Sequence, residues 1–169
     1  MGGYIDFKIS VLGDVQFERN LVQFSESISD WTEPLKKAGD IFYRVEKEQF
    51  DSQGGYSGGW VALSPRYAIW KAKHYPGQPI LVRKGDLRGS LIKKGSKGSL
   101  YKLTPTRLEK GTNVPYAIYH QSTGKRRKLP RRPPVDIPET VMGIKGEWIE
   151  LFRKRIVEER RRIFGAMGT

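Results

Sequence analysis

The sequence predicts an α+β fold: an N-terminal strand and a long helix packed on a small, mostly antiparallel sheet with short helices, plus a C-terminal amphipathic helix. Three observations predict it. Apolar residues alternate near the N-terminus, then recur at helical spacing, and short turn-bounded segments follow. With 169 residues and 37% hydrophobic content, the chain suits one modest core. We expect one domain over residues 1–136, with a basic arm at 122–134, and a helical extension over 137–169.

A change in the spacing of apolar residues predicts a strand followed by a long helix. Residues 4–12 alternate between apolar and polar side chains, as a half-buried strand does. From Phe17 to Val45 the apolar residues step by threes and fours, which indicates a long helical seam. Pro34 interrupts the seam, so we expect a kink or a break, with Asp30 or Thr32 capping a second helix. Because the seam keeps its phase, both pieces should pack on one surface.

The middle of the chain reads as a helix, a turn and a strand. Ser64-Pro65 is a strong helix start, and Tyr75–Gly77 ends that helix. Ile80–Val82 is predicted as a strand, whereas Leu87–Ile92 fits either a strand or a short helix. Six apolar residues of this region are predicted to lie in the core: Trp60, Leu63, Tyr67, Trp70, Ile80 and Leu81.

The second half is rich in turns. Residues 99–103 and 107–110 are predicted to form a hairpin, and Tyr116–His120 a short helical turn. Near the C-terminus, apolar residues from Ile144 to Ile163 recur at helical spacing with arginines outside them, and Gly165 is a natural helix end.

Residues 51–59 are predicted to form a flexible loop because they contain four glycines. Gly54 and Gly59 have the spacing of a phosphate-binding loop, but Trp60-Val61 stand where that motif needs Lys and Ser or Thr. The loop is either a plain linker or an exposed segment that orders against a partner. The candidate interface residues are Gly54, Gly55, Tyr56, Ser57, Gly58 and Gly59.

Charge is distributed unevenly along the chain, whose net charge is +13. Residues 1–60 hold six Lys/Arg and ten Asp/Glu, a net charge of −4, whereas residues 61–169 hold 25 and eight, a net charge of +17. The basic end suits nucleic acid, or the acidic end of an identical neighbour. Six cations in a Pro-rich stretch are the candidate contacts with a partner or with DNA, unless the run is a solvated loop: Lys125, Arg126, Arg127, Lys128, Arg131 and Arg132.

The sequence contains no catalytic constellation, so we expect no enzyme activity and no cofactor. His74 and His120 have no recognisable partner, and Ser64 is better explained as a helix cap than as a nucleophile. The chain has no cysteine and no cluster of metal ligands, so no metal is expected. It also lacks a stretch apolar enough to span a membrane.

Two groups of residues share their order and spacing with a known family. The first group is Trp60–Ser64, Tyr67-Ala68, Lys71, Pro79–Leu81 and Gly85–Ser90. The second group is Gly111–Ala117, His120-Gln121 and Leu129–Pro133. In this order the chain resembles the phage virion morphogenesis family, also called tail completion proteins, over about residues 4–136.

Three departures from the family pattern stand out. Ser122–Gly124 follows His-Gln, where the family has an aromatic residue and Gly. Pro134–Asp136 stands where the family has Phe-Leu-Gly, which leaves the docking of the C-terminal segment open. Pro34 interrupts the long helix.

The resemblance implies a structural virion protein at the head–tail junction of a tailed phage, made in the host bacterial cytoplasm. It implies a ring of identical subunits in contact with neighbouring neck, connector and tail tube or terminator proteins, and it brings no catalytic residues. The arm at 125–132 would then meet an acidic neighbour or DNA in the channel. The alternative is a small basic protein that binds DNA non-specifically through residues 125–132.

Trp60 provides a test of the predicted core. If its side chain is buried, Trp60→Ala should lower the free energy of unfolding by about 3–5 kcal/mol, because it leaves a large cavity. Urea denaturation measures the loss, and a change below about 1 kcal/mol would place Trp60 at the surface or at a subunit contact.

Overall fold

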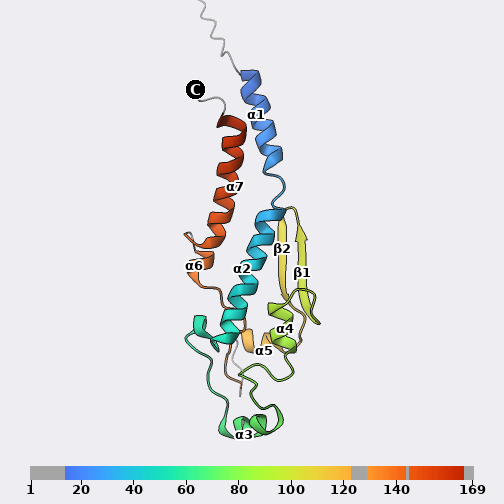
Figure 1. Ribbon diagram of the computed structural model, residues 1–169, viewed down its shortest axis with the longest axis vertical. Helices are drawn as coiled ribbons and strands as arrows, with labels where there is room; N and C mark the ends of the chain where they lie inside the picture. The colour runs from blue at the N-terminus through green and yellow to red at the C-terminus, as the bar shows by residue number, and fades with distance from the viewer. Residues whose placement is uncertain (1–13, 123–128, 144, 166–169) are drawn as a thin grey trace, which may run out of the picture.

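The computed structural model is an elongated α+β molecule whose long helices run along its long axis (Figure 1). It describes residues 14–122, 129–143 and 145–165. The helices and strands, in chain order, are α1 (Asp14–Ser27), α2 (Thr32–Asp51), the 3₁₀ turn η1 (Gly55–Ser57), α3 (Pro65–His74), α4 (Asp86–Ile92), β1 (Ser99–Thr104), β2 (Arg107–Thr112), α5 (Ala117–Gln121), α6 (Glu139–Met142) and α7 (Glu147–Phe164). The predicted fold class is confirmed, while the strand predicted over residues 4–12 lies outside the described residues.

The long N-terminal helix breaks just before Pro34, as the sequence predicts. The break lies between α1 and α2, and Pro34 occupies the first turn of α2, where a helix needs no proline N–H. Asp30 Oδ1 accepts a hydrogen bond from the Thr32 amide at 2.8 Å, and the Trp31 amide donates to the Pro105 carbonyl at 2.7 Å. The break is therefore tied to the tip of the hairpin.

α2 is the central element, and its seam keeps one phase along its length. Ala38 and Val45 are fully buried. Beside them, Phe42 packs edge-on against Trp148 of α7, with ring centroids 5.3 Å apart. At its C-terminal end Phe50 meets Trp60 at 5.3 Å in a T-shaped pair. Trp60 is thus in the core, in a cluster with Phe50, Val82, Leu87, Leu91 and Ala117.

β1 and β2 form the predicted hairpin, in an antiparallel register from Ser99↔Thr112 to Thr104↔Arg107. One buried cation joins this hairpin to the helices. Lys110 of β2 pairs with the Glu46 carboxylate of α2 and donates to the Leu91 carbonyl of α4 at 2.9 Å. Its ammonium also lies 4.0 Å from the centroid of the Tyr43 ring. Both partners of the ion pair are almost fully buried.

Three predictions for the segment around α3 need correction or completion. Ile80–Val82 is a turn and no strand, because Leu81 has a left-handed backbone (φ 60°) that an extended chain does not adopt. Tyr67 and Trp70 are each 40% exposed and do not belong to the core, since α3 lies at the end of the molecule. Leu87–Ile92, which the sequence left open, lies in helix α4.

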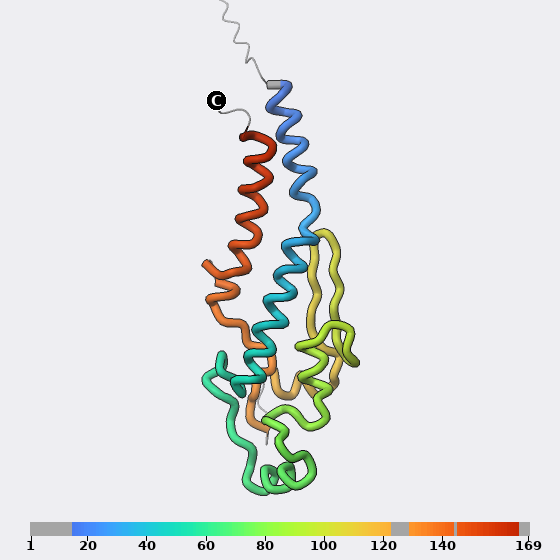
Figure 2. The backbone as a smooth tube through the Cα atoms, viewed as in Figure 1, coloured from blue at the N-terminus to red at the C-terminus, as the bar shows by residue number. Residues whose placement is uncertain are grey.

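α7 packs along both α1 and α2 (Figure 2). Trp31 meets Phe152 at a centroid distance of 5.4 Å, and Phe24 meets Phe164 at 5.9 Å. Arg155 donates to the Ser27 carbonyl at 3.2 Å, at the junction of α1 and α2. The predicted C-terminal helix is therefore present, and it is the principal support of α1.

The Glu46–Lys110 pair yields a prediction about stability. Burial raises the pKa of Glu46 and lowers the pKa of Lys110, so each charge is costly without the other. Glu46→Met or Lys110→Met alone should cost about 3–5 kcal/mol, because each leaves a buried charge unpaired. The double substitution should cost clearly less than the sum in a urea-denaturation cycle. Additive losses would contradict this coupling.

Candidate functional site

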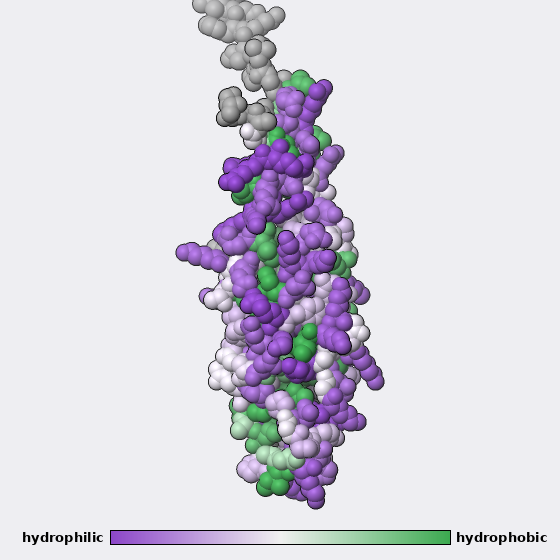
Figure 3. Space-filling model, viewed as in Figure 1, coloured by the Kyte–Doolittle hydropathy of each residue, from purple (hydrophilic) through white to green (hydrophobic). Residues whose placement is uncertain are grey.

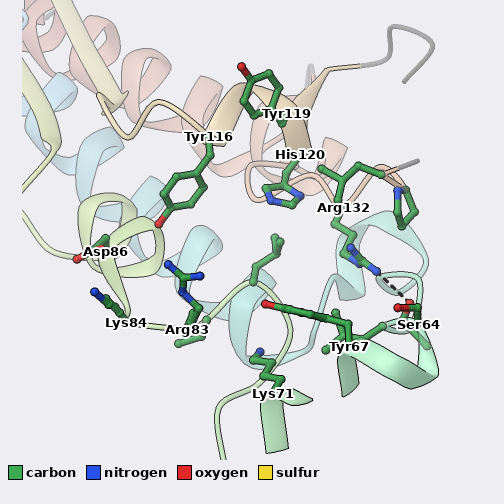
Figure 4. Close-up of a pocket in the computed structure, with 16 residues that line it drawn as sticks. Ser64, Tyr67, Lys71, Arg83, Lys84, Asp86, Tyr116, Tyr119, His120 and Arg132 are labelled. Carbon is green, nitrogen blue, oxygen red and sulfur yellow. Dashed lines mark hydrogen bonds between the residues drawn. The ribbon is translucent and has the colours of Figure 1, made fainter. Parts of the chain in front are cut away.

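A cavity of about 670 Å³ lies between α3, the loop before α4, and α5 (Figure 4). Its walls are rich in tyrosine and in basic side chains. They comprise Ala62, Leu63, Ser64, Tyr67, Lys71, Leu81, Val82, Arg83, Lys84, Asp86, Tyr116, Tyr119, His120, Leu129, Pro130 and Arg132. Four chain segments that are distant in sequence therefore meet at one site.

The first wall is α3, whose start positions Tyr67 and Lys71. Ser64 has an extended backbone and Pro65 opens the helix, as the sequence predicts. Lys71 is the buried residue of α3, only 5% exposed, and its Nζ donates to the Pro79 carbonyl. The turn that replaces the predicted strand supplies this carbonyl, so the turn is needed to hold the lysine.

The second wall consists of Leu129, Pro130 and Arg132, after which the chain passes through the interior at Pro133 and Pro134. Gln49 Nε2 and Trp60 Nε1 each donate to the Pro133 carbonyl at 3.1 Å. Arg132 is 5% exposed, and it donates through Nε to the Val61 carbonyl at 2.7 Å and through Nη2 to the Ala62 carbonyl at 2.9 Å. These contacts close the end of the core against the loop before α3.

Arg132 is therefore buried and does not belong to an exposed basic arm, while its role as a contact with a partner or with DNA stays a prediction. Its hydrogen bonds serve the fold, and its side chain faces the cavity. Arg131 is exposed and donates to the Gln121 carbonyl at 3.3 Å. The other four candidate cations, at 125–128, lie outside the described residues.

The electrostatics of the cavity are strongly positive. Burial lowers the pKa of Lys71, and the nearby Arg132 lowers it further. Burial likewise lowers the pKa of Arg132. Figure 4 shows Lys71, Arg83 and Arg132 around the cavity, with Asp86, the one acidic residue of its lining, beside Lys84 at one side.

An exposed aromatic stack continues from the cavity along α3. The Tyr67 and Trp70 rings stack with centroids 5.5 Å apart, and Trp70 and His74 stack at 4.6 Å. His74 Nδ1 also lies 2.7 Å from the Trp70 carbonyl oxygen. The ladder follows from helical spacing, and it offers a flat surface at the end of the molecule.

The first part of the glycine loop before α3 is tied by hydrogen bonds to the end of α2. The Gly54 amide donates to the Gln49 carbonyl at 2.8 Å, and the Tyr56 amide donates to Gln49 Oε1 at 3.0 Å. Gly54 is buried with φ 91°, and a Cβ there would lie 2.3 Å from Trp60 Cδ1. Gly54 is thus packed against the core, while flexibility of the rest of the loop stays a prediction. The exposed members of the predicted interface loop are Gly55, Tyr56, Gly58 and Gly59.

Neither histidine is part of a recognisable catalytic or metal-binding cluster. Within residues 14–122, 129–143 and 145–165, no group of three or more His, Cys, Asp or Glu residues is placed to hold a metal ion. His120 lines the cavity near the three tyrosines. No helix in the described part of the chain is long and apolar enough to cross a membrane.

Sequence reasoning missed the cavity, although one signal was present. Lys71 follows Tyr67 by four residues, on the helix face that was predicted to be apolar. A lysine in that position has to be explained by a specific partner. Lys71 and Arg132 are about sixty residues apart in the sequence. A local sequence pattern therefore cannot show that both line one cavity.

Comparisons of the chain with protein-family models, with curated proteins and with solved structures gave no match.

The adjacent residues Arg131 and Arg132 form a matched pair for a stability test. Arg132→Ala should cost about 2–4 kcal/mol, because it removes buried contacts and leaves two carbonyls without their donor. Arg131→Ala should change stability by less than about 0.5 kcal/mol, since that side chain is exposed. Thermal and urea unfolding measure both. Equal losses would mean that Arg132 does not close the core.

Proposed function

We propose that this protein is a structural virion component of a tailed phage that completes the tail and joins it to the head at the neck. In this role it assembles as a ring of identical subunits. The order of motifs from Trp60 to Pro133 supports the proposal, as does the order of elements after residue 14: long helix, short helices and hairpin.

The observation that carries the proposal is the exposed apolar surface of α1. This helix projects beyond the hairpin and is flanked by α7 (Figure 2). Four of its apolar side chains are between 44% and 58% exposed: Val15, Phe17, Leu21 and Val22. An amphipathic helix with this much apolar surface in solvent is typical of a contact with another subunit.

Charge supports a head-to-tail contact, in a narrower form than the sequence predicts. Several acids of the first sixty residues are paired within the subunit, among them Glu46 with Lys110 and Asp51 with Arg88. The exposed acids of α1 and α2 are Glu18, Glu26, Glu33, Asp40 and Asp51, of which Glu33 and Asp51 have partners within the subunit. Exposed cations gather around the hairpin and the end of α4: Lys93, Lys94, Lys97, Lys102 and Arg107. The basic surface of the hairpin supports a heterologous, ring-forming interface in which it meets exposed acids of a neighbouring subunit.

A second candidate function is non-specific binding of nucleic acid. The stack of Tyr67, Trp70 and His74 supports it, because bases stack on exposed aromatic rings. Figure 3 shows polar surface over much of one face, with apolar patches at the end that α3 forms. Lys73 and Arg66 are exposed on the same helix and would meet phosphates.

Two exposed apolar residues allow a direct test of ring formation. Val22→Lys on α1 should abolish assembly with the neck proteins, because it places a charge in the apolar contact, while Ile118→Lys on α5 should leave assembly intact. Both side chains are about equally exposed, at 58% and 61%, so neither change should unfold the subunit. Native mass spectrometry with and without the neighbouring neck proteins, and counts of joined virions, measure the outcome.

Normal joining of heads and tails by the Val22→Lys protein would contradict the proposed interface. Tight DNA binding by the monomer would instead favour the second function, especially if replacing residues 125–128 by serine flattened its salt dependence. Weak DNA binding without sequence preference, together with entry into a ring, supports the virion role.

A further inference from the structure

Two buried cations share the wall of the α3 cavity. Lys71 and Arg132 are each 5% exposed. Lysine and arginine are rarely buried to this degree unless a carboxylate or another anion neutralises them. Within the described residues, neither group forms an ion pair with a carboxylate, and their polar contacts are the main-chain carbonyls of Pro79, Val61 and Ala62.

The surroundings of the two cations increase their need for a counter-charge. Arg83 and Lys84 also line the cavity and are exposed. The acidic residue in the lining, Asp86, is exposed beside Lys84, as Figure 4 shows. The neighbouring stretch at 125–128 is basic in sequence, so it does not bring an anion. Among the described residues no carboxylate pairs with Lys71 or Arg132, so an anion from another molecule would compensate their charge.

The donors and walls indicate what kind of anion fits. Arg132 already uses Nε and Nη2 on carbonyls, and Lys71 uses one of its three ammonium hydrogens. About five hydrogens remain, three on Arg132 and two on Lys71, and the two oxygens of a carboxylate can accept from both side chains. The walls add aromatic and aliphatic surface, chiefly from Tyr67, Leu63, Leu81, Tyr116, Leu129 and Pro130.

We propose that this cavity binds the carboxyl terminus of a partner polypeptide whose last residues are apolar. The terminal carboxylate sits between Lys71 and Arg132, and the last side chains lie against the tyrosines and leucines of the walls. At its carboxyl terminus a polypeptide enters the cavity once and ends there. To bring in an internal acidic residue, the chain would have to enter the cavity and leave it again. The inference does not depend on the virion role, since a carboxyl terminus can belong to any partner.

The test compares matched peptides on the full chain. Acetyl-Ala-Leu-Phe with a free carboxyl terminus is titrated against the same peptide as its carboxamide, and against amidated acetyl-Ala-Glu-Leu-Phe and inorganic phosphate. NMR shift changes of the cavity residues report binding. We expect the free acid to bind at least tenfold more tightly than the carboxamide and than phosphate. Equal binding of acid and carboxamide, tighter binding of phosphate, or tighter binding of the internal glutamate would each overturn the proposal.

Lys73, on the same helix, provides a matched control for a substitution of Lys71. Lys71→Gln removes the buried charge at similar length and should weaken binding of the free acid at least tenfold. Lys73→Gln changes an exposed lysine that does not line the cavity, and should leave binding unchanged. Equal effects of the two substitutions would overturn the assignment.

A measurement on the unmodified protein guards against a variant that fails to fold. Because burial and Arg132 hold the pKa of Lys71 below its ordinary value, a bound carboxylate should raise it, as ¹⁵N NMR of the ammonium group would show. The affinity for the free acid should accordingly fall as the pH rises through the pKa of Lys71 in the free protein. An unchanged Lys71 pKa at saturating peptide would exclude the site. If the peptide tests fail and ring assembly is normal, the virion role stands without the proposed site. If the peptides bind as expected and no ring assembles, the site stands without the virion role.

Discussion

The buried ammonium of Lys110 is the contact on which the arrangement of sheet and helices depends. It joins α2 through Glu46, α4 through the Leu91 carbonyl, and the Tyr43 ring through a cation–π contact, all from a strand of the hairpin. A two-stranded sheet is marginal by itself, so its position has to be set by what it packs on. A buried ion pair adds little net stability over an apolar pair, but it tolerates only one register of β2 against α2. The hairpin is thereby held at one place along the central helix.

A second set of buried hydrogen bonds lies at the C-terminal end of α2, next to the candidate site. Gln49 is fully buried and contacts both the glycine loop and the Pro133 carbonyl, which also accepts from Trp60. Arg132, the residue before Pro133, donates hydrogen bonds to the segment that leads into α3. Satisfying these polar groups places two cations, Arg132 and Lys71, against one cavity. The positive charge of the site therefore results from the way the fold is closed, and among the described residues neither Lys71 nor Arg132 has a carboxylate partner.

The two ends of the molecule differ in what they offer a partner. At one end α1 and α7 expose apolar side chains on a narrow helical projection, which suits a broad contact with another subunit. At the other end α3 and the cavity combine stacked aromatic rings with buried positive charge, which suits a small, specific anion. The central helix separates these surfaces. A subunit of this shape can hold an identical neighbour and a different protein at the same time.

The sequence by itself determined the α+β class, the break before Pro34, the start of α3 at Ser64-Pro65 and the hairpin, because each depends on local periodicity or turn chemistry. Only the tertiary structure decided which charges are buried. Arg131 and Arg132 are neighbours in one basic run, yet one is exposed, and the other reaches carbonyls seventy and more residues away. The tertiary structure also decided the backbone conformation of Leu81. Its left-handed backbone makes the predicted strand a turn, and that turn holds Lys71. Burial and such turns are set by contacts between distant segments, and a local pattern contains no information about which segments meet.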